Sequence, residues 1–225
     1  MKTIILACSL LIVAASCQDK ANSESEQDAP VKELSTAEKI ANAHGYESWD
    51  QVDKLAFTFN VDRGEYHSER SWVWEPKTGA VTMMTSQDTI NYNHTKVDST
   101  VMSADAGFIN DKYWLLAPFQ LLWDSESSDI SEKAAQIAPI SGDTLDMITI
   151  TYKSEGGYTP GDAYDFYYGS DYTIKEWVFR KGNAPEPGMI TTWEDYAQYG
   201  PLNLAKTHKD STQVLNINFT GIKVN

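Results

Sequence analysis

Histidines and carboxylates are the residues that could do chemistry in this chain of 225 residues. His67 and Glu69 lie two positions apart, which places them on one face of a strand, and His94 could join them on a neighbouring strand as an acid–base site. Asp162 and Asp165 could pair as carboxylate acid and base, or coordinate calcium. Solvated strand faces and turn chemistry account for both groups without a site. We therefore expect no catalytic residue among them.

Sequence motifs of known catalytic and metal sites give no support for an enzyme. Neither Gly-x-Ser-x-Gly nor Ser-x-x-Lys occurs with supporting partners. The four histidines form no His-x-His or His-Glu-x-x-His pair. The acidic segment 124–132 lacks the glycine and the ligand order of a calcium loop, and we predict a solvated loop there. We expect a non-catalytic protein without metal or cofactor, and a hydrolase with a dispersed site remains the alternative.

Cys17 is placed for covalent attachment of lipid. Lys2 precedes an apolar run, residues 4–15, that is too short to span a bilayer, as in a signal peptide. Ala14-Ala15-Ser16-Cys17 resembles the bacterial lipobox, in which the cysteine becomes the acylated first residue of the mature chain. This pattern predicts a signal peptide over residues 1–16 and lipidation at Cys17. Secretory cleavage near Ser16 without lipidation is the alternative.

The segment 17–34 has the composition of a tether. It is rich in Ser, Glu, Asp and Asn and has no apolar periodicity, so we predict a flexible lead from the lipid to the domain. Gln18 after the cysteine resembles outer-membrane sorting. Because Cys8 would be lost on cleavage, Cys17 would be the last cysteine, which excludes a disulfide within the mature chain. The predicted location is the bacterial outer membrane, at the periplasmic face or the cell surface.

Charge narrows the range of partners. The chain has 18 basic and 32 acidic residues, a formal net charge of -14. This excess repels nucleic-acid backbones and anionic lipid head groups, so we expect no nucleic-acid partner and membrane contact through the lipid alone. Residues 35–225 are enough for one domain with a sizeable core. We expect this domain to be a monomer.

Periodicity predicts a mainly β domain that begins with a short helix. Ser35 to Glu38 form a capping box, Gly45 is a natural helix stop, and a second helical turn is expected over 48–53. From Leu55 to Val61 apolar and polar residues alternate as in a half-buried strand. Further strands with turn residues between them predict an antiparallel meander; they cover residues 67–75, 80–85, 89–94, 145–152, 164–168, 174–181, 190–196, 202–208 and 214–222.

The most apolar part of the mature chain is residues 104–122. Pro118 lacks the amide hydrogen that a continuous helix needs at that position. We therefore expect a helix over 110–116, followed by an extended segment that ends near Trp123.

Several of these segments together resemble a known group of proteins. His44-Gly45 followed by Trp49, the run from Asp111 to Phe119, and Asp162 to Tyr168 before Trp177 resemble Bacteroidetes lipoproteins of unknown function, which are related to the Lol-type lipoprotein carrier and receptor fold. The resemblance implies an α+β fold in which a single strongly curved antiparallel sheet forms an open half-barrel, with short helices covering its concave face. In Lol proteins that concavity holds acyl chains.

Aromatic residues supply the predicted binding surface. With 7 Trp, 12 Tyr and 7 Phe, the chain has rigid surface suited to a thick core or to an apolar pocket. We predict a lipoprotein that binds an apolar or amphipathic ligand, in a cavity of several hundred Å³ between the sheet and the helix over 110–116. A structural lipoprotein with a filled interior is the other alternative. The candidate lining residues are Phe57, Phe59, Trp72, Trp74, Tyr113, Trp114, Phe119 and Trp177.

Overall fold

A computed structural model describes residues 33–155 and 158–225. The chain divides into two compact units, residues 1–33 and 34–225, and every element described below belongs to the second. The predicted signal peptide, Cys17 and all but the last residues of the predicted tether lie outside the described residues. No helix in the described ranges combines the length and the apolar character that crossing a bilayer requires.

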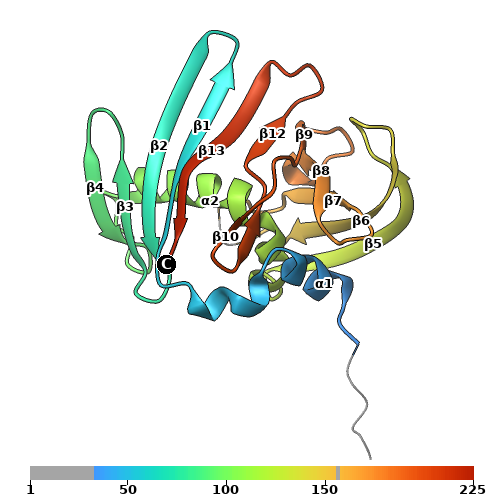
Figure 1. Cartoon of the computed structure of the whole chain (residues 1–225), viewed down its shortest axis with the longest axis horizontal. Coiled ribbons are helices and arrows are strands. Elements are labelled where there is room, and N and C mark those ends of the chain that lie inside the picture. Colours follow the sequence, from blue (N-terminus) through green and yellow to red (C-terminus); the bar gives the residue numbers. More distant parts are fainter. Residues whose placement is uncertain (1–32, 156–157) are drawn as a thin grey trace, which may run out of the picture. The chain divides into compact units, whose positions relative to one another are not determined.

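Two antiparallel sheets and one long helix, α2 (Met102–Trp123), make up most of this unit (Figure 1). The first sheet has the order β12-β13-β1-β2-β3-β4, and the second has the order β5-β6-β7-β8-β9. The first consists of β1 (Leu55–Arg63), β2 (Tyr66–Glu75), β3 (Ala80–Met84), β4 (Thr89–Asn93), β12 (Thr207–Lys209) and β13 (Leu215–Val224). The second consists of β5 (Ser128–Ile137), β6 (Thr144–Tyr152), β7 (Ala163–Tyr168), β8 (Ile174–Arg180) and β9 (Met189–Thr192).

The mainly β, antiparallel character is as predicted, but the single sheet is divided. Beyond the strand β9, one bridge between Glu194 and Thr207 connects the two sheets. The predicted strands over 190–196 and 202–208 are each broken, because the short hairpin β10 (Ala197–Tyr199) and β11 (Leu202–Leu204) intervenes. Asp195 and Gly200 have φ angles of 55° and 56°, a left-handed conformation that interrupts an extended strand. Neither main sheet closes into a barrel within the described residues.

The acidic segment 124–132 was expected to be a loop, and this is wrong for its second half. The strand β5 starts at Ser128 and pairs with β6 at the edge of the second sheet. Nearly all of its side chains are exposed, so its sequence shows no alternation of apolar and polar residues. An edge strand with two solvated faces therefore resembles a loop in sequence.

The predicted capping box is present at the helix α1 (Thr36–Ala43). The Ser35 hydroxyl accepts from the Glu38 amide at 3.2 Å, and the Glu38 carboxylate accepts from the Ser35 amide at 2.7 Å. Gly45 follows with φ 96°, and a Cβ there would lie 2.3 Å from the carbonyl oxygen of Pro201. Only glycine fits this close approach. The next turn is the 3-10 helix η1 (Tyr46–Gln51), close to the predicted segment 48–53.

The helix α2 is longer than predicted and lies in the core. It starts at Met102 and continues past Pro118, with a kink at Leu116, where φ is -120° and ψ is 19°. The kink accommodates Pro118 within the helix. Side chains on most faces of the helix are buried, and their packing stabilises it. Its Phe108 ring lies 5.4 Å from Trp72 of the first sheet, and Trp114 lies 4.4 Å from Trp177 of the second. α2 therefore packs against both sheets.

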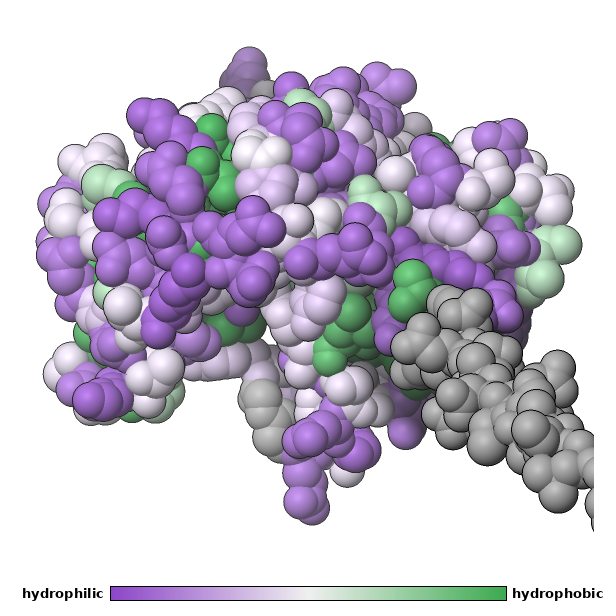
Figure 2. All heavy atoms as spheres, turned by 60° about the horizontal axis from the view of Figure 1, so that its bottom comes forward, coloured by the Kyte–Doolittle hydropathy of each residue, from purple (hydrophilic) through white to green (hydrophobic). Residues whose placement is uncertain are grey.

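The face of the molecule in Figure 2 is mainly hydrophilic. Figure 2 shows one face, on which hydrophobic residues form small separate patches among hydrophilic ones. Patches of this kind are ordinary on soluble domains and need no partner to cover them.

Candidate functional site

A cavity of about 460 Å³ lies between α2 and the two sheets. We call it the apolar chamber. Its volume is typical of sites for small apolar ligands, and it lies where the sequence predicts it, although the helix on one wall extends well beyond 110–116. The lining residues are Phe59, Val61, Arg70, Ala106, Ile109, Asn110, Tyr113, Trp114, Tyr158, Thr159, Tyr164, Trp177, Phe179, Met189 and Ile217.

Aromatic rings form one wall of the apolar chamber. The Tyr164 ring lies 4.7 Å from Tyr113, 5.2 Å from Trp177 and 5.1 Å from Phe179, measured between centroids. The ring centroids of Trp114 and Trp177 are 4.4 Å apart. This chain of ring contacts joins α2 to the second sheet along one wall of the apolar chamber.

Four of the eight predicted lining residues face this chamber: Phe59, Tyr113, Trp114 and Trp177. The other four pack in the core away from it. The rings of Phe57 and Phe219 are 5.8 Å apart, and the rings of Trp72 and Trp74 each contact Phe108. Phe119 contacts Tyr46 and Trp49 of η1 and Trp123 of α2. The alternation of strand residues identifies the buried face, but it does not distinguish a packed position from one beside a cavity.

Arg70 is the charged group at the apolar chamber, and it is anchored on α2. Its Nε and Nη2 donate to the two carboxylate oxygens of Asp111 at 2.9 and 2.7 Å. The indole Nε1 of Trp72 donates to the same carboxylate at 2.8 Å. Asp111 is fully buried, whereas the Arg70 side chain is 41% exposed. This group therefore joins α2 to the first sheet at the mouth of the chamber.

A second cavity of about 300 Å³ adjoins the first. We call it the polar chamber, because ionisable groups make up much of its wall. Ile109, Tyr113, Tyr158 and Thr159 line both chambers, which makes them neighbours across a shared wall. The remaining lining residues are His94, Lys112, Gln120, Asp124, Ser127, Tyr152, Lys153 and Glu155.

Two carboxylates organise the polar chamber. Asp105 is buried, lies 2.6 Å from Nδ1 of His94, and accepts from the Tyr158 hydroxyl at 2.5 Å, which raises the pKa of Tyr158 to about 12. Asp124 accepts from the Tyr152 hydroxyl at 2.6 Å. Burial raises the pKa of Asp124, and the hydrogen bond from Tyr152 opposes that shift.

Lys112 contributes a buried amine to the same chamber. Its Nζ lies 5.1 Å from the ring centroid of Trp74 and 5.6 Å from those of Phe108 and Trp123. Burial lowers its pKa to about 8. No hydrogen bond or ion pair joins this amine to any residue in the described part of the chain. Asp124 and Asp105 are near enough to oppose this lowering of the pKa, although neither forms an ion pair with the amine.

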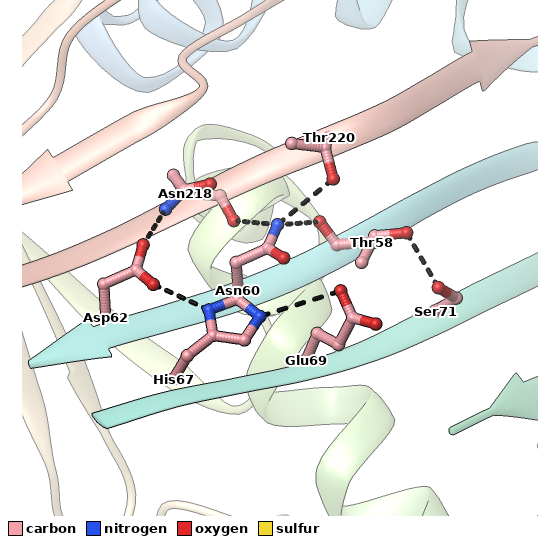
Figure 3. A network of polar contacts seen from close by, with 8 residues as sticks. All are labelled: Thr58, Asn60, Asp62, His67, Glu69, Ser71, Asn218 and Thr220. Atoms are coloured by element: carbon pink, nitrogen blue, oxygen red, sulfur yellow. Dashed lines mark hydrogen bonds and ion pairs between the residues drawn. The ribbon is translucent and has the colours of Figure 1, made fainter. Parts of the chain in front are cut away.

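The predicted acid–base site does not assemble. His67 lies on the face of β1 and β2 opposite Phe57 and Phe59, between Asp62 at 2.7 Å and Glu69 at 3.8 Å (Figure 3). Its neighbours there are polar strand residues, as the solvated-face explanation expects. His94 instead lies beside the polar chamber. Because the two histidines lie apart, His67, Glu69 and His94 do not form the acid–base site considered for the alternative enzyme.

Asp162 and Asp165 have separate structural partners. Asp165 forms a two-point ion pair with Arg180, at 2.8 and 2.9 Å, and accepts from the Thr149 hydroxyl at 2.7 Å. Asp162 accepts from the amide of Gly182 at 2.7 Å. Within the described ranges, no three His, Cys, Asp or Glu side chains are grouped as a metal site. Both aspartates therefore have structural roles.

Comparisons with known proteins concern the fold alone. A DUF1329 family protein of Desulfovibrio piger is similar with a TM-score of 0.48 and 10% identity, over 84% of this chain and 92% of the other. A LolA superfamily protein of Nitrosomonas europaea gives 0.48 and 8%, over 85% and 94%. A domain of Vibrio parahaemolyticus assigned to outer membrane lipoprotein-sorting proteins gives 0.47 and 10%, over 84% and 93%. No family model and no curated protein matches the chain.

Sequence reasoning missed Arg70, Asp105, Lys112, Tyr158 and Tyr164. One signal was available, because Asp111 and Lys112 interrupt the most apolar stretch of the chain. Charged residues inside such a stretch must be paired or face a cavity. The structure shows one of each, with Asp111 paired and Lys112 at the polar chamber.

Proposed function

We propose that this chain is a non-catalytic lipoprotein of the bacterial envelope that binds an apolar or amphipathic ligand. The apolar chamber carries the proposal, because a filled interior would have excluded it. Its volume of about 460 Å³ and its aromatic wall suit a flexible hydrocarbon chain. Native mass spectrometry with lipid extraction, on protein purified from its own envelope, tests for a bound ligand. Recovery of no ligand, together with no binding of an acyl-chain fluorophore, would favour a purely structural role.

A larger side chain at Ala106 should block the apolar chamber. Ala106 lies on α2, is partly exposed and lines the cavity, so Ala106→Trp places an indole in the space for the ligand. We expect the affinity for an acyl-chain fluorophore to fall at least about tenfold, the equivalent of one or two lost apolar contacts. Met102→Trp adds an exposed indole on the same helix, outside the chamber, and should bind as the wild type does. Equal binding by both variants would place the ligand elsewhere.

Anchoring is the second part of the proposal and has its own test. Cys17→Ser should move the protein from the membrane fraction to the soluble envelope fraction, because the expected acyl chains at Cys17 supply its membrane affinity. Fractionation followed by immunoblotting measures the change. Cys8→Ala is the control, because it removes the other thiol of the chain and leaves Ala14-Ala15-Ser16-Cys17 intact. Membrane association that persists in Cys17→Ser would show that the lipobox interpretation is wrong.

A further inference from the structure

The two chambers differ in polarity across a shared wall. One side offers aromatic and aliphatic side chains from both sheets, and the other offers Lys112 and His94 together with carboxylates and hydroxyl groups. Ile109 and Tyr113 of α2 line both spaces. A molecule that occupies both chambers would need an apolar part for one and a polar part for the other. The pair of chambers therefore matches an amphipathic ligand better than a purely apolar one.

The charge that the polar part of the ligand should carry follows from the partners of the charged residues in the polar chamber. Asp124 is held by Tyr152, and Asp105 is held by His94 and Tyr158. Lys153 donates to the backbone carbonyl of Glu126. Within the described residues Lys112 has no hydrogen bond or ion pair, although it is only 8% exposed.

A caged ammonium of this kind is an incomplete site. Three aromatic rings offset part of the cost of burying the charge, but no residue in the described ranges accepts a hydrogen bond from the amine. An anionic group in the polar chamber would supply both acceptors and counter-charge. Asp124 and Glu155, which line the same chamber, and Asp105, whose charge acts on Lys112, oppose such an anion, whereas Lys153 favours it.

We propose that the polar chamber receives the anionic head group of a single-chain amphiphile, with Lys112 as its counter-ion, while the chain occupies the apolar chamber. This inference rests on the proposed ligand binding and adds the class of ligand and its orientation. Bound anion also stabilises the protonated amine, so binding weakens as the pH rises above the pKa of Lys112, about 8.

The test compares ligands that share a chain and differ in the head group. Protein carrying Cys17→Ser, which the proposed anchoring predicts to be soluble, is titrated with dodecanoate, dodecyl phosphate and dodecanol by displacement of an acyl-chain fluorophore. We expect both anions to bind at least about tenfold more tightly than the alcohol, since a charge-assisted hydrogen bond contributes about that factor. Lys112→Met should remove this preference and leave the affinity for dodecanol unchanged, because the methionine keeps the length and fills the aromatic cage.

Two further variants sharpen the result. Lys133→Met removes an exposed lysine on β5 and should bind all three ligands as the parent does. Asp124→Asn removes the opposing carboxylate and should strengthen binding of both anions. Failure of all three ligands would overturn the proposed function itself. Binding of acid and alcohol with equal affinity would leave that function standing and refute the role of Lys112, and dodecanoate without dodecyl phosphate would restrict the head group to a carboxylate.

Discussion

Asp111→Ala is expected to lower the free energy of unfolding by about 3 kcal/mol, the typical cost of removing one partner of a buried ion pair. The carboxylate is fully buried and accepts from Arg70 at two atoms and from the Trp72 indole. Without the Asp111 carboxylate, the buried indole N–H of Trp72 has no hydrogen-bond acceptor, and the Arg70 guanidinium must be hydrated by solvent instead. Since Arg70 is partly exposed, the loss should not exceed the usual range. Urea unfolding followed by tryptophan fluorescence measures the effect.

The matched control is another aspartate that forms an ion pair at the surface. Asp53 pairs with Lys77 at 2.6 Å, but both side chains are more than half exposed. Asp53→Ala should change stability by less than about 0.5 kcal/mol, because water screens such pairs. Asp111→Asn keeps an acceptor for Trp72 and should fall between the two. An Asp111→Ala variant as stable as the Asp53 control would show that the ion pair does not hold α2 to the first sheet.

Mild acid is expected to unfold the protein through two buried histidines. Burial lowers the pKa of His44 from 6.5 to about 4 and that of His208 from 6.5 to about 3. The unfolded chain therefore binds more protons than the folded chain below pH 6.5, so stability is complete above that pH and is lost as the pH falls. At ~1.4 kcal/mol per pKa unit, the two residues together remove about 5 kcal/mol by about pH 4.5. That is comparable to the whole stability of many domains.

Unfolding free energies at a series of pH values test this expectation. His44→Gln and His208→Gln should each lower the slope by about 1.4 kcal/mol per pH unit in this range, since each removes one proton taken up on unfolding. His67→Gln is the control with the opposite sign. The hydrogen bond to Asp62 raises the pKa of this exposed histidine, so it favours the folded state in acid. A stability that stays constant from pH 7 to 5 would contradict the assignment.

Local patterns predicted the parts of the fold that depend on neighbouring residues. The capping box at Ser35, the stop at Gly45 and the alternation along β1 were all correct. The predictions were wrong where contacts between residues distant in sequence determine the local structure. Pro118 should end a helix in isolation, but the core around α2 compensates for the missing hydrogen bond. The edge strand β5 owes its conformation to pairing with β6, and its own residues carry no periodic signal.

The candidate site was predictable in kind but only partly in its residues. Aromatic content and strand alternation indicated an apolar cavity beside the central helix, and Phe59, Tyr113, Trp114 and Trp177 line it. Which buried aromatics face a void depends on how two sheets and a kinked helix meet. No single-sequence pattern encodes that junction. The polar chamber was missed because its groups come from β4, α2 and the segments around β5 and β6, which are far apart in sequence.

The place of β13 in the first sheet sets the order in which the chain can fold. β13 lies between β12 and β1, with Phe59 opposite Phe219 and Val61 opposite Ile217. The first sheet therefore stays incomplete until residues 215–224 pair with β1, which lies far before them in sequence. Pairing across such a separation in sequence is slow. The β1-β2-β3-β4 part of the sheet, whose strands follow one another in sequence, is therefore expected to form before β1 pairs with β13.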